Sequence, residues 1–152
     1  MGGKANLCAL VVDDNRDAAQ SLAQVLELLG CEASYLTDPR DVLQETLRLK
    51  PHIAFLDIGM PHLSGYQLAR DLRRHFAPEE LKIVAITAYG GPDDRVASRQ
   101  AGFDAHVQKP ADPELVRSIL HTLVPDLPSG GDEESEIRLT YRELSALIED
   151  VP

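Results

Sequence analysis

Five short, largely apolar segments alternate with stretches of helical periodicity through most of this chain of 152 residues. The segments are residues 7–12, 31–36, 53–56, 82–86 and 105–108. Segments of this length, most of them apolar throughout, are typical of strands buried on both faces of a parallel sheet. The helices between them must then cover both faces through right-handed connections. The pattern predicts an α/β fold, a doubly wound five-stranded parallel sheet with helices on both faces.

Capping residues mark where the predicted helices begin and end. Gly30 closes the first helix, and Asp38 supplies an N-cap for the second, with a proline at its first helical position. Ser64 precedes the third helix, and Asp112, again followed by proline, caps the fifth. Residues 90–92, Gly-Gly-Pro, predict a mobile entry to the fourth.

Polar side chains stand where four of the predicted strands end. Asp13 and Asp14 follow the first strand, Asp57 follows the third, Thr87 the fourth, and Lys109 the fifth. In an open parallel sheet, ligands bind beyond the carboxyl ends of the strands, at the point where the strand order reverses. We therefore expect these five side chains to converge on one site.

Three carboxylates at one site repel one another by about 4 kcal/mol per pair at a separation of about 4 Å, so they need a cation. Carboxylate oxygens, a backbone carbonyl and water are the oxygen ligands that suit Mg²⁺. The Thr87 hydroxyl and the Lys109 ammonium suit the oxygens of a phosphoryl group, over which charge spreads during transfer. Asp57 is then the nucleophile, since a carboxylate accepts a phosphoryl group as an aspartyl phosphate.

With these residues at its strand ends, the chain resembles the receiver domains of two-component response regulators over about residues 7–124. The resemblance implies a flavodoxin-like receiver fold with the strand order 2-1-3-4-5. Residues 56–61 and 101–106 look most like receivers attached to hybrid histidine kinases, or like stand-alone single-domain regulators. A receiver is not a metabolic enzyme, although it assists its own phosphorylation and dephosphorylation.

The resemblance assigns the metal ligands and the phosphoacceptor. By this resemblance, Asp14 and Asp57, with the backbone carbonyl of Gly59, would bind Mg²⁺. Asp13 would act through a metal-bound water. Asp57 would receive the phosphoryl group from a phosphohistidine on a histidine kinase or a histidine phosphotransfer protein.

The resemblance also assigns the switch. Thr87 would move toward the phosphoryl oxygen and Lys109 would pair with it, with the bond between Lys109 and Pro110 in the cis form. The face from the fourth to the fifth helix would then change its preference for a downstream protein partner. The resemblance also allows a homodimer.

Two positions bear on how such a switch would behave. His106 stands three residues before Lys109, where the family often has Tyr or Phe. Either part of the signal depends on protonation of His106, or this is an ordinary surface or half-buried histidine. Tyr89, two residues after Thr87, either tunes access of water to the acyl phosphate or is a plain loop aromatic.

Three alternatives share parts of this pattern. A phosphatase of the haloacid dehalogenase type also forms an aspartyl phosphate, but it usually carries a second Asp where this chain has Gly59. A pseudo-receiver would use the same fold as a phosphate-independent binding module, although no acid, hydroxyl or lysine of the site is missing here. The chain could also be the receiver module of a hybrid histidine kinase.

Charge and composition exclude several other classes. The net charge of −10 argues against a nucleic-acid surface, which needs clustered Lys and Arg. No apolar run approaches the length of about 18 residues that spans a membrane, and the first residues lack a secretory signal. We therefore expect a cytoplasmic protein without membrane contact. Cys8 and Cys31 adjoin apolar runs, which favours reduced thiols over a disulfide or a metal pair.

The C-terminal residues differ from the rest of the chain. Residues 126–152 hold eight acidic and two basic residues, against 17 acidic and 13 basic before them. We expect a receiver domain over residues 1–125, then an acidic linker and short tail over residues 126–152. Thr140 and Glu143 fit a capping box, and the apolar residues after them allow a short amphipathic helix that docks on this domain or a partner. The alternative is a disordered acidic tail, and either is too short for a DNA-binding domain.

Overall fold

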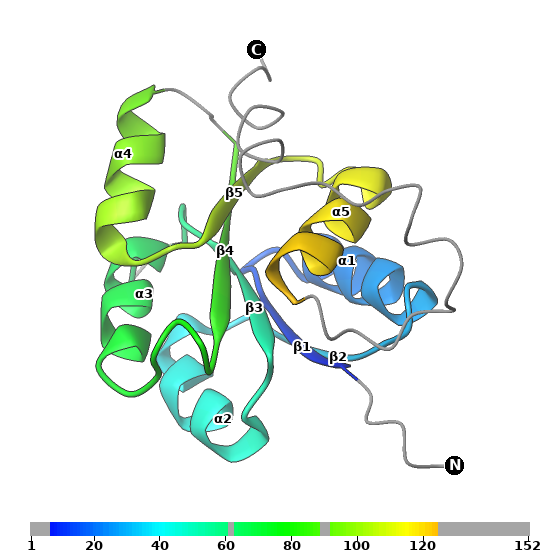
Figure 1. Cartoon of the computed structure of the whole chain (residues 1–152), viewed down its shortest axis with the longest axis horizontal. Coiled ribbons are helices and arrows are strands. Elements are labelled where there is room, and N and C mark those ends of the chain that lie inside the picture. The colour runs from blue at the N-terminus through cyan, green and yellow to red at the C-terminus, as the bar shows by residue number, and fades with distance from the viewer. Residues whose placement is uncertain (1–6, 61–62, 89–91, 125–152) are drawn as a thin grey trace.

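The computed structural model of the chain describes residues 7–60, 63–88 and 92–124, with residues 92–94 described as backbone only. Five parallel strands form one sheet in the order β2-β1-β3-β4-β5 (Figure 1). The strands are β1 (Leu7–Val12), β2 (Cys31–Leu36), β3 (Ile53–Asp57), β4 (Lys82–Thr87) and β5 (Ala105–Gln108). This arrangement confirms both the predicted fold class and the predicted strand order.

Helices cover both faces of the sheet. They are α1 (Arg16–Leu28), α2 (Val42–Leu49), α3 (Gly65–Arg73), α4 (Pro92–Ala101) and α5 (Pro113–Leu123), with a 3₁₀ turn, η1 (Pro39–Asp41), before α2. In Figure 1, α1 and α5 lie on one side of the sheet, and α2, α3 and α4 lie on the other. None of these helices has the length and hydropathy needed to cross a lipid bilayer.

Two apolar cores lie on the two faces of the sheet, because alternate residues of a strand point to opposite sides. One core joins Val11 and Phe55 to Leu26 of α1 and Ile119 of α5. The other joins strand residues such as Leu56 to the apolar sides of α2, α3 and α4. The central strands are therefore buried on both faces, as their continuous apolar composition predicts.

The helix boundaries follow the predicted capping residues with one difference. Ser64 and Asp112 cap α3 and α5, since their side chains accept hydrogen bonds from backbone N–H groups of the first turn. The Asp38 side chain likewise accepts from the N–H of Arg40, but the turn that it caps is a 3₁₀ turn and not the first turn of an α-helix. The α-helix proper begins at Val42, whose preceding residue makes no side-chain cap. The predicted second helix is therefore shorter than its proline signal suggests.

Several predictions concern residues outside the described ones. These are the mobile entry at residues 90 and 91, the role of Tyr89, and the linker and tail over residues 126–152. The two cysteines lie within the described part and are free thiols, Cys31 buried and Cys8 half-buried.

Candidate functional site

Three carboxylates meet at the carboxyl edge of β1 and β3. One ligand atom each from Asp13, Asp14 and Asp57 lies within 4.8 Å of the others. The register pairs the last residue of β1 with Leu56, which places Asp13 beside Asp57. Asp13 and Asp57 are 2% and 5% exposed, whereas Asp14 is open to solvent. Two carboxylates of the cluster are thus buried, and the third is accessible to solvent.

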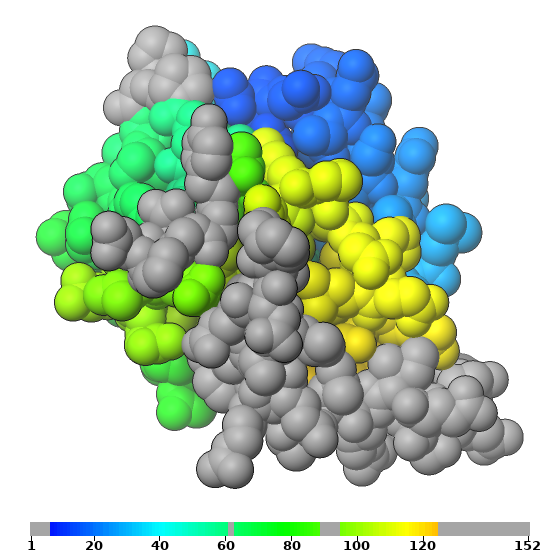
Figure 2. Space-filling view, turned by 90° about the horizontal axis from the view of Figure 1, so that it is seen from above, coloured from blue at the N-terminus to red at the C-terminus, as the bar shows by residue number. Residues whose placement is uncertain are grey.

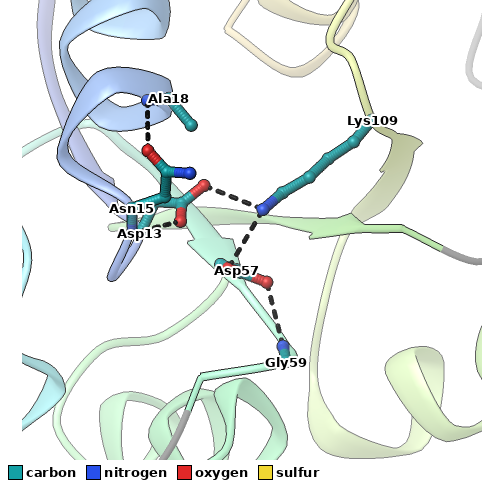
Figure 3. A network of polar contacts seen from close by, with 6 residues as sticks. All are labelled: Asp13, Asn15, Ala18, Asp57, Gly59 and Lys109. Atoms are coloured by element: carbon teal, nitrogen blue, oxygen red, sulfur yellow. Dashed lines mark hydrogen bonds and ion pairs between the residues drawn. The ribbon is translucent and has the colours of Figure 1, made fainter.

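Lys109 joins two of the three carboxylates (Figure 3). Its Nζ lies 3.0 Å from Asp13 Oδ2 and 3.1 Å from Asp57 Oδ2. Burial by itself lowers the pKa of Lys109, but the hydrogen bonds and charges of Asp13 and Asp57 outweigh it and leave the pKa raised. Lys109 is therefore a fixed cation between two carboxylates.

The surroundings of Asp13 disfavour the ionised form of its carboxyl group. Burial raises its pKa, and the charge of Asp57 adds to that effect. Hydrogen bonds from the Asn15 backbone and from Lys109 act in the opposite direction without cancelling the rise. A further cation beside Asp13 would therefore stabilise its ionised form.

Asp57 is held by one donor on each carboxylate oxygen. Its Oδ1 accepts the backbone N–H of Gly59 at 2.9 Å, and its Oδ2 accepts from Lys109. A Cβ at Gly59 would lie 3.6 Å from Asp57 Oδ1, which is an ordinary contact. The contact of Gly59 with Asp57 is thus through its N–H, and the carbonyl of Gly59 as a metal ligand stays a prediction.

Thr87 ends β4 beside this cluster. It is buried, and its backbone carbonyl accepts the N–H of Lys109 at 2.7 Å. The peptide bond between Lys109 and Pro110 is cis, as the resemblance implies. The ends of β4 and β5 are therefore tied together at the point from which Lys109 reaches the carboxylates.

His106 lies in β5 with its side chain buried, 6% exposed. Its Nδ1 is 3.3 Å from Ser98 Oγ on α4. The expectation of an ordinary surface or half-buried histidine is therefore wrong, because β5 turns this side chain under α4. His106 is a contact between the strand that precedes Lys109 and the helix of the predicted output face.

Two residues that shape the site were missed at the level of sequence. Asn15 caps α1 and donates its backbone N–H to Asp13. At Gly65 a Cβ would lie 2.6 Å from Ile58 Cα and 2.7 Å from the carbonyl oxygen of Asp57, so only glycine lets α3 begin this close to the end of β3. An Asn directly before a helical stretch is a visible signal, but the close approach at Gly65 depends on tertiary packing.

A groove of about 540 Å³ opens beside the cluster, between α1 and the segment that joins β5 to α5. Figure 2 shows these two segments, in blue and in yellow, side by side. Asp13 and Lys109 line the groove, together with the apolar residues Ala18, Leu22, Val25, Ile86 and Pro110. A partner bound in this groove would lie next to the acidic site.

Comparison with known proteins identifies the family. Residues 9–121 match the response regulator receiver domain. This chain belongs to that family. It is a receiver domain of the kind that two-component response regulators carry, and such domains are in general not metabolic enzymes. An Asp cluster like that of Asp13, Asp14 and Asp57 is where receiver domains typically bind Mg²⁺.

The relatives and structures similar to this receiver domain agree with that assignment. The response regulator Rre1 of Synechocystis sp. is 32% identical over 93% of this chain and 63% of that protein. The response regulator MprA of Mycolicibacterium vanbaalenii is 34% identical over 90% of this chain and 58% of its own length. This chain thus spans about three fifths of the length of these two relatives. The crystal structure of a putative response regulator from Chloroflexus aurantiacus superposes with a TM-score of 0.71, at 29% identity, over 78% of this chain and 98% of that one.

Proposed function

We propose that this receiver domain is a phosphorylation-dependent switch in which Asp57 accepts a phosphoryl group in the presence of Mg²⁺. The observation that carries the proposal is the contact of Lys109 with both Asp13 and Asp57, within a cluster of three carboxylates. A cluster of net charge −2 at a strand edge is costly unless it serves to bind a cation. Phosphoryl transfer requires this combination of a nucleophile, a metal site and a fixed cation.

The two donors on Asp57 orient its carboxylate for attack. The Gly59 N–H and the Lys109 ammonium hold Oδ1 and Oδ2, so the plane of the carboxylate is set before the phosphodonor protein binds. A carboxylate oxygen would form a bond to phosphorus while the bond from phosphorus to the imidazole nitrogen of a phosphohistidine breaks. The leaving imidazole takes up a proton from solvent, and Asp57 becomes an aspartyl phosphate.

The residues of the cluster fit a magnesium ion. Asp14, Asp57 and the carbonyl of Gly59 would hold it, with Asp13 acting through a water molecule. Bound there, Mg²⁺ would neutralise charge on the phosphoryl oxygens. The raised pKa of Asp13 supports the fit, because the charge of a divalent cation would offset the burial and the repulsion from Asp57 that cause the rise.

Thr87 and Lys109 would sense the phosphoryl group. The Thr87 hydroxyl would donate to one phosphoryl oxygen, and Lys109 would exchange part of its contact with Asp13 for another. Because β4 and β5 are joined at these two residues, a movement there reaches α4 and α5. The face from α4 to α5 would then change its preference for a downstream protein partner.

The proposed partners and organisation follow the family. A histidine kinase or a histidine phosphotransfer protein in the cytoplasm would donate the phosphoryl group to Asp57. Residues 1–125 would form the receiver domain, and residues 126–152 would form the acidic linker and tail. The domain would act alone, as a homodimer, or as the receiver module of a hybrid histidine kinase. Tyr89 would tune the lifetime of the aspartyl phosphate.

Intact mass spectrometry after incubation with acetyl phosphate and Mg²⁺ tests the proposal. The chain should gain about 80 Da, the mass of one phosphoryl group, and the gain should vanish with chelator and in Asp57→Asn. Asp17→Asn is the matched control, since Asp17 is an exposed acid of α1 that is not part of the cluster. No gain in the folded wild type would refute the proposal and favour the pseudo-receiver.

A further inference from the structure

Asn15 connects the acidic cluster to the first turn of α1 (Figure 3). Its backbone N–H donates to Asp13 Oδ1 at 2.9 Å, and its side-chain Oδ1 accepts the N–H of Ala18 at 3.1 Å. Asn15 has the extended backbone of an N-cap residue, with φ −85° and ψ 110°. Asn15 therefore donates one hydrogen bond to the carboxylate and accepts one from the helix.

The bond from Asn15 completes the support of the Asp13 carboxylate. Lys109 contacts Oδ2, and the Asn15 N–H occupies Oδ1, so the two oxygens are held from two different elements. Asp13 is buried, and solvent therefore has little access to compensate for a lost donor. Without the N–H of Asn15 this carboxylate would still contact Lys109 through Oδ2 but could rotate about that contact.

We propose that Asn15 is a positioning residue of the metal site, which orients Asp13 through its own cap on α1. The proposal rests on the proposed function, in which Asp13 belongs to the Mg²⁺ site. The side-chain bond to Ala18 stabilises the extended backbone of Asn15, and in that form its N–H points at Asp13. Removal of the side-chain oxygen frees the backbone and costs the site an ordered carboxylate.

Three variants separate this role from ordinary helix capping. Asn15→Ala removes the cap, Asn15→Ser restores an acceptor at the same position, and Asn15→Gly removes the acceptor while keeping most of the helix stability. Ser64→Ala is the matched control, because the Ser64 side chain caps α3 by accepting the N–H of Gln67 at 3.2 Å. Both alanine variants should lower the Tm by a similar amount.

Magnesium binding by the full chain is measured by isothermal titration calorimetry, together with the Mg²⁺ concentration for half-maximal phosphorylation by acetyl phosphate. Asn15→Ala and Asn15→Gly should each need about ten-fold more Mg²⁺, the lower end of what one lost hydrogen bond to a charged group costs. The phosphorylation rate at saturating Mg²⁺ should stay that of the wild type, because Asp57 and Lys109 are unchanged. Asn15→Ser and Ser64→Ala should bind Mg²⁺ as the wild type does.

Two results would overturn the inference. One is wild-type Mg²⁺ affinity in Asn15→Gly, and the other is a loss of affinity in Ser64→Ala as large as in Asn15→Ala. Failure of the wild type itself to bind Mg²⁺ is a different result, which removes the proposed function. The two failures are therefore read from different samples.

Discussion

Arg73 holds three segments together at the amino ends of β4 and β5, on the side of the sheet away from the acidic cluster. Arg73→Met should therefore destabilise the fold. Its Nε, Nη1 and Nη2 donate to the carbonyl of Gly102 at 3.0 Å, the carbonyl of Leu81 at 2.7 Å and Asp104 Oδ2 at 2.7 Å. The same Asp104 oxygen accepts the N–H of Ile83 at 2.8 Å. The C-terminal end of α3 is thus tied to the entries of β4 and β5.

The size of the effect follows from burial. The side chains of Arg73 and Asp104 are 15% and 20% exposed. Removal of one partner from a buried pair costs about 3–5 kcal/mol, and the remaining exposure favours the lower end, about 3 kcal/mol. For a domain of this size that loss corresponds to a fall in Tm of roughly 10 °C. Methionine keeps the length and apolar stem of the side chain, so the measured loss reports mainly on the three hydrogen bonds and the charge.

Arg74→Met is the matched control. Arg74 is the next residue of the chain, its side chain is 74% exposed, and its Nη1 lies 3.7 Å from Asp71 Oδ1. Exposed pairs of this kind contribute about 0–1 kcal/mol. Thermal and urea unfolding of the wild type and both variants, followed by circular dichroism, should place Arg74→Met near the wild type and Arg73→Met well below it.

The reasoning would be refuted if the Tm of Arg73→Met lay within about 2 °C of that of Arg74→Met. Mg²⁺ affinity gives a second check, because Arg73 lies at the amino ends of the strands and the cluster lies at their carboxyl ends. The folded fraction of Arg73→Met should bind Mg²⁺ as the wild type does. A loss of affinity in the folded variant would mean that the two edges of the sheet are coupled.

Three further predictions concern single residues. Burial raises the pKa of Asp13, so its ionised form destabilises the metal-free fold. Asp13→Asn should therefore raise the Tm in chelator and reduce the rise in Tm that Mg²⁺ produces. Scanning fluorimetry with and without Mg²⁺ measures both values, and two values equal to those of the wild type would contradict this prediction. Gly102→Ala should lower the Tm more than Gly30→Ala, because both glycines have φ above +100° but only a Cβ at Gly102 meets a side chain, Arg73 Cγ at 2.7 Å; equal melting temperatures would argue against the clash. Burial raises the pKa of Cys31 to about 11, which leaves roughly one thiolate in a thousand at about pH 8; mass spectrometry should find Cys31 unlabelled by iodoacetamide until denaturant is added, and rapid labelling of the native protein would count against its burial.

Strand positions could be predicted because each strand is a short apolar run that ends in polar or turn residues. The errors were at the ends, where hydrogen bonds to a neighbouring strand decide the boundary. Asp57 and Thr87 belong to β3 and β4 rather than following them, since Asp57 still pairs with Ile86 and Thr87 with Gln108. The 3₁₀ turn before α2 was missed because Asp38 followed by a proline gives the same capping signal there as Asp112 followed by a proline gives for the α-helix α5.

The candidate site was predictable in its members but not in its contacts. Parallel strands end at one edge of the sheet, so acids and a lysine at strand ends had to gather there. Asp13 and Asp14 are adjacent in the chain, yet one is buried under Lys109 and the other faces solvent. That difference depends on how β3 and Lys109 pack beside the end of β1, and local sequence patterns do not predict such packing.

The sequence by itself determined the fold class, the strand positions and the residues at the strand ends, because periodicity and capping are local properties of the chain. Tertiary structure alone decided which atoms meet. It placed Lys109 between Asp13 and Asp57, brought the N–H of Asn15 to Asp13, and turned His106 under α4. Contacts between residues far apart in the chain depend on strand register and helix packing, which form only when the whole sheet is assembled.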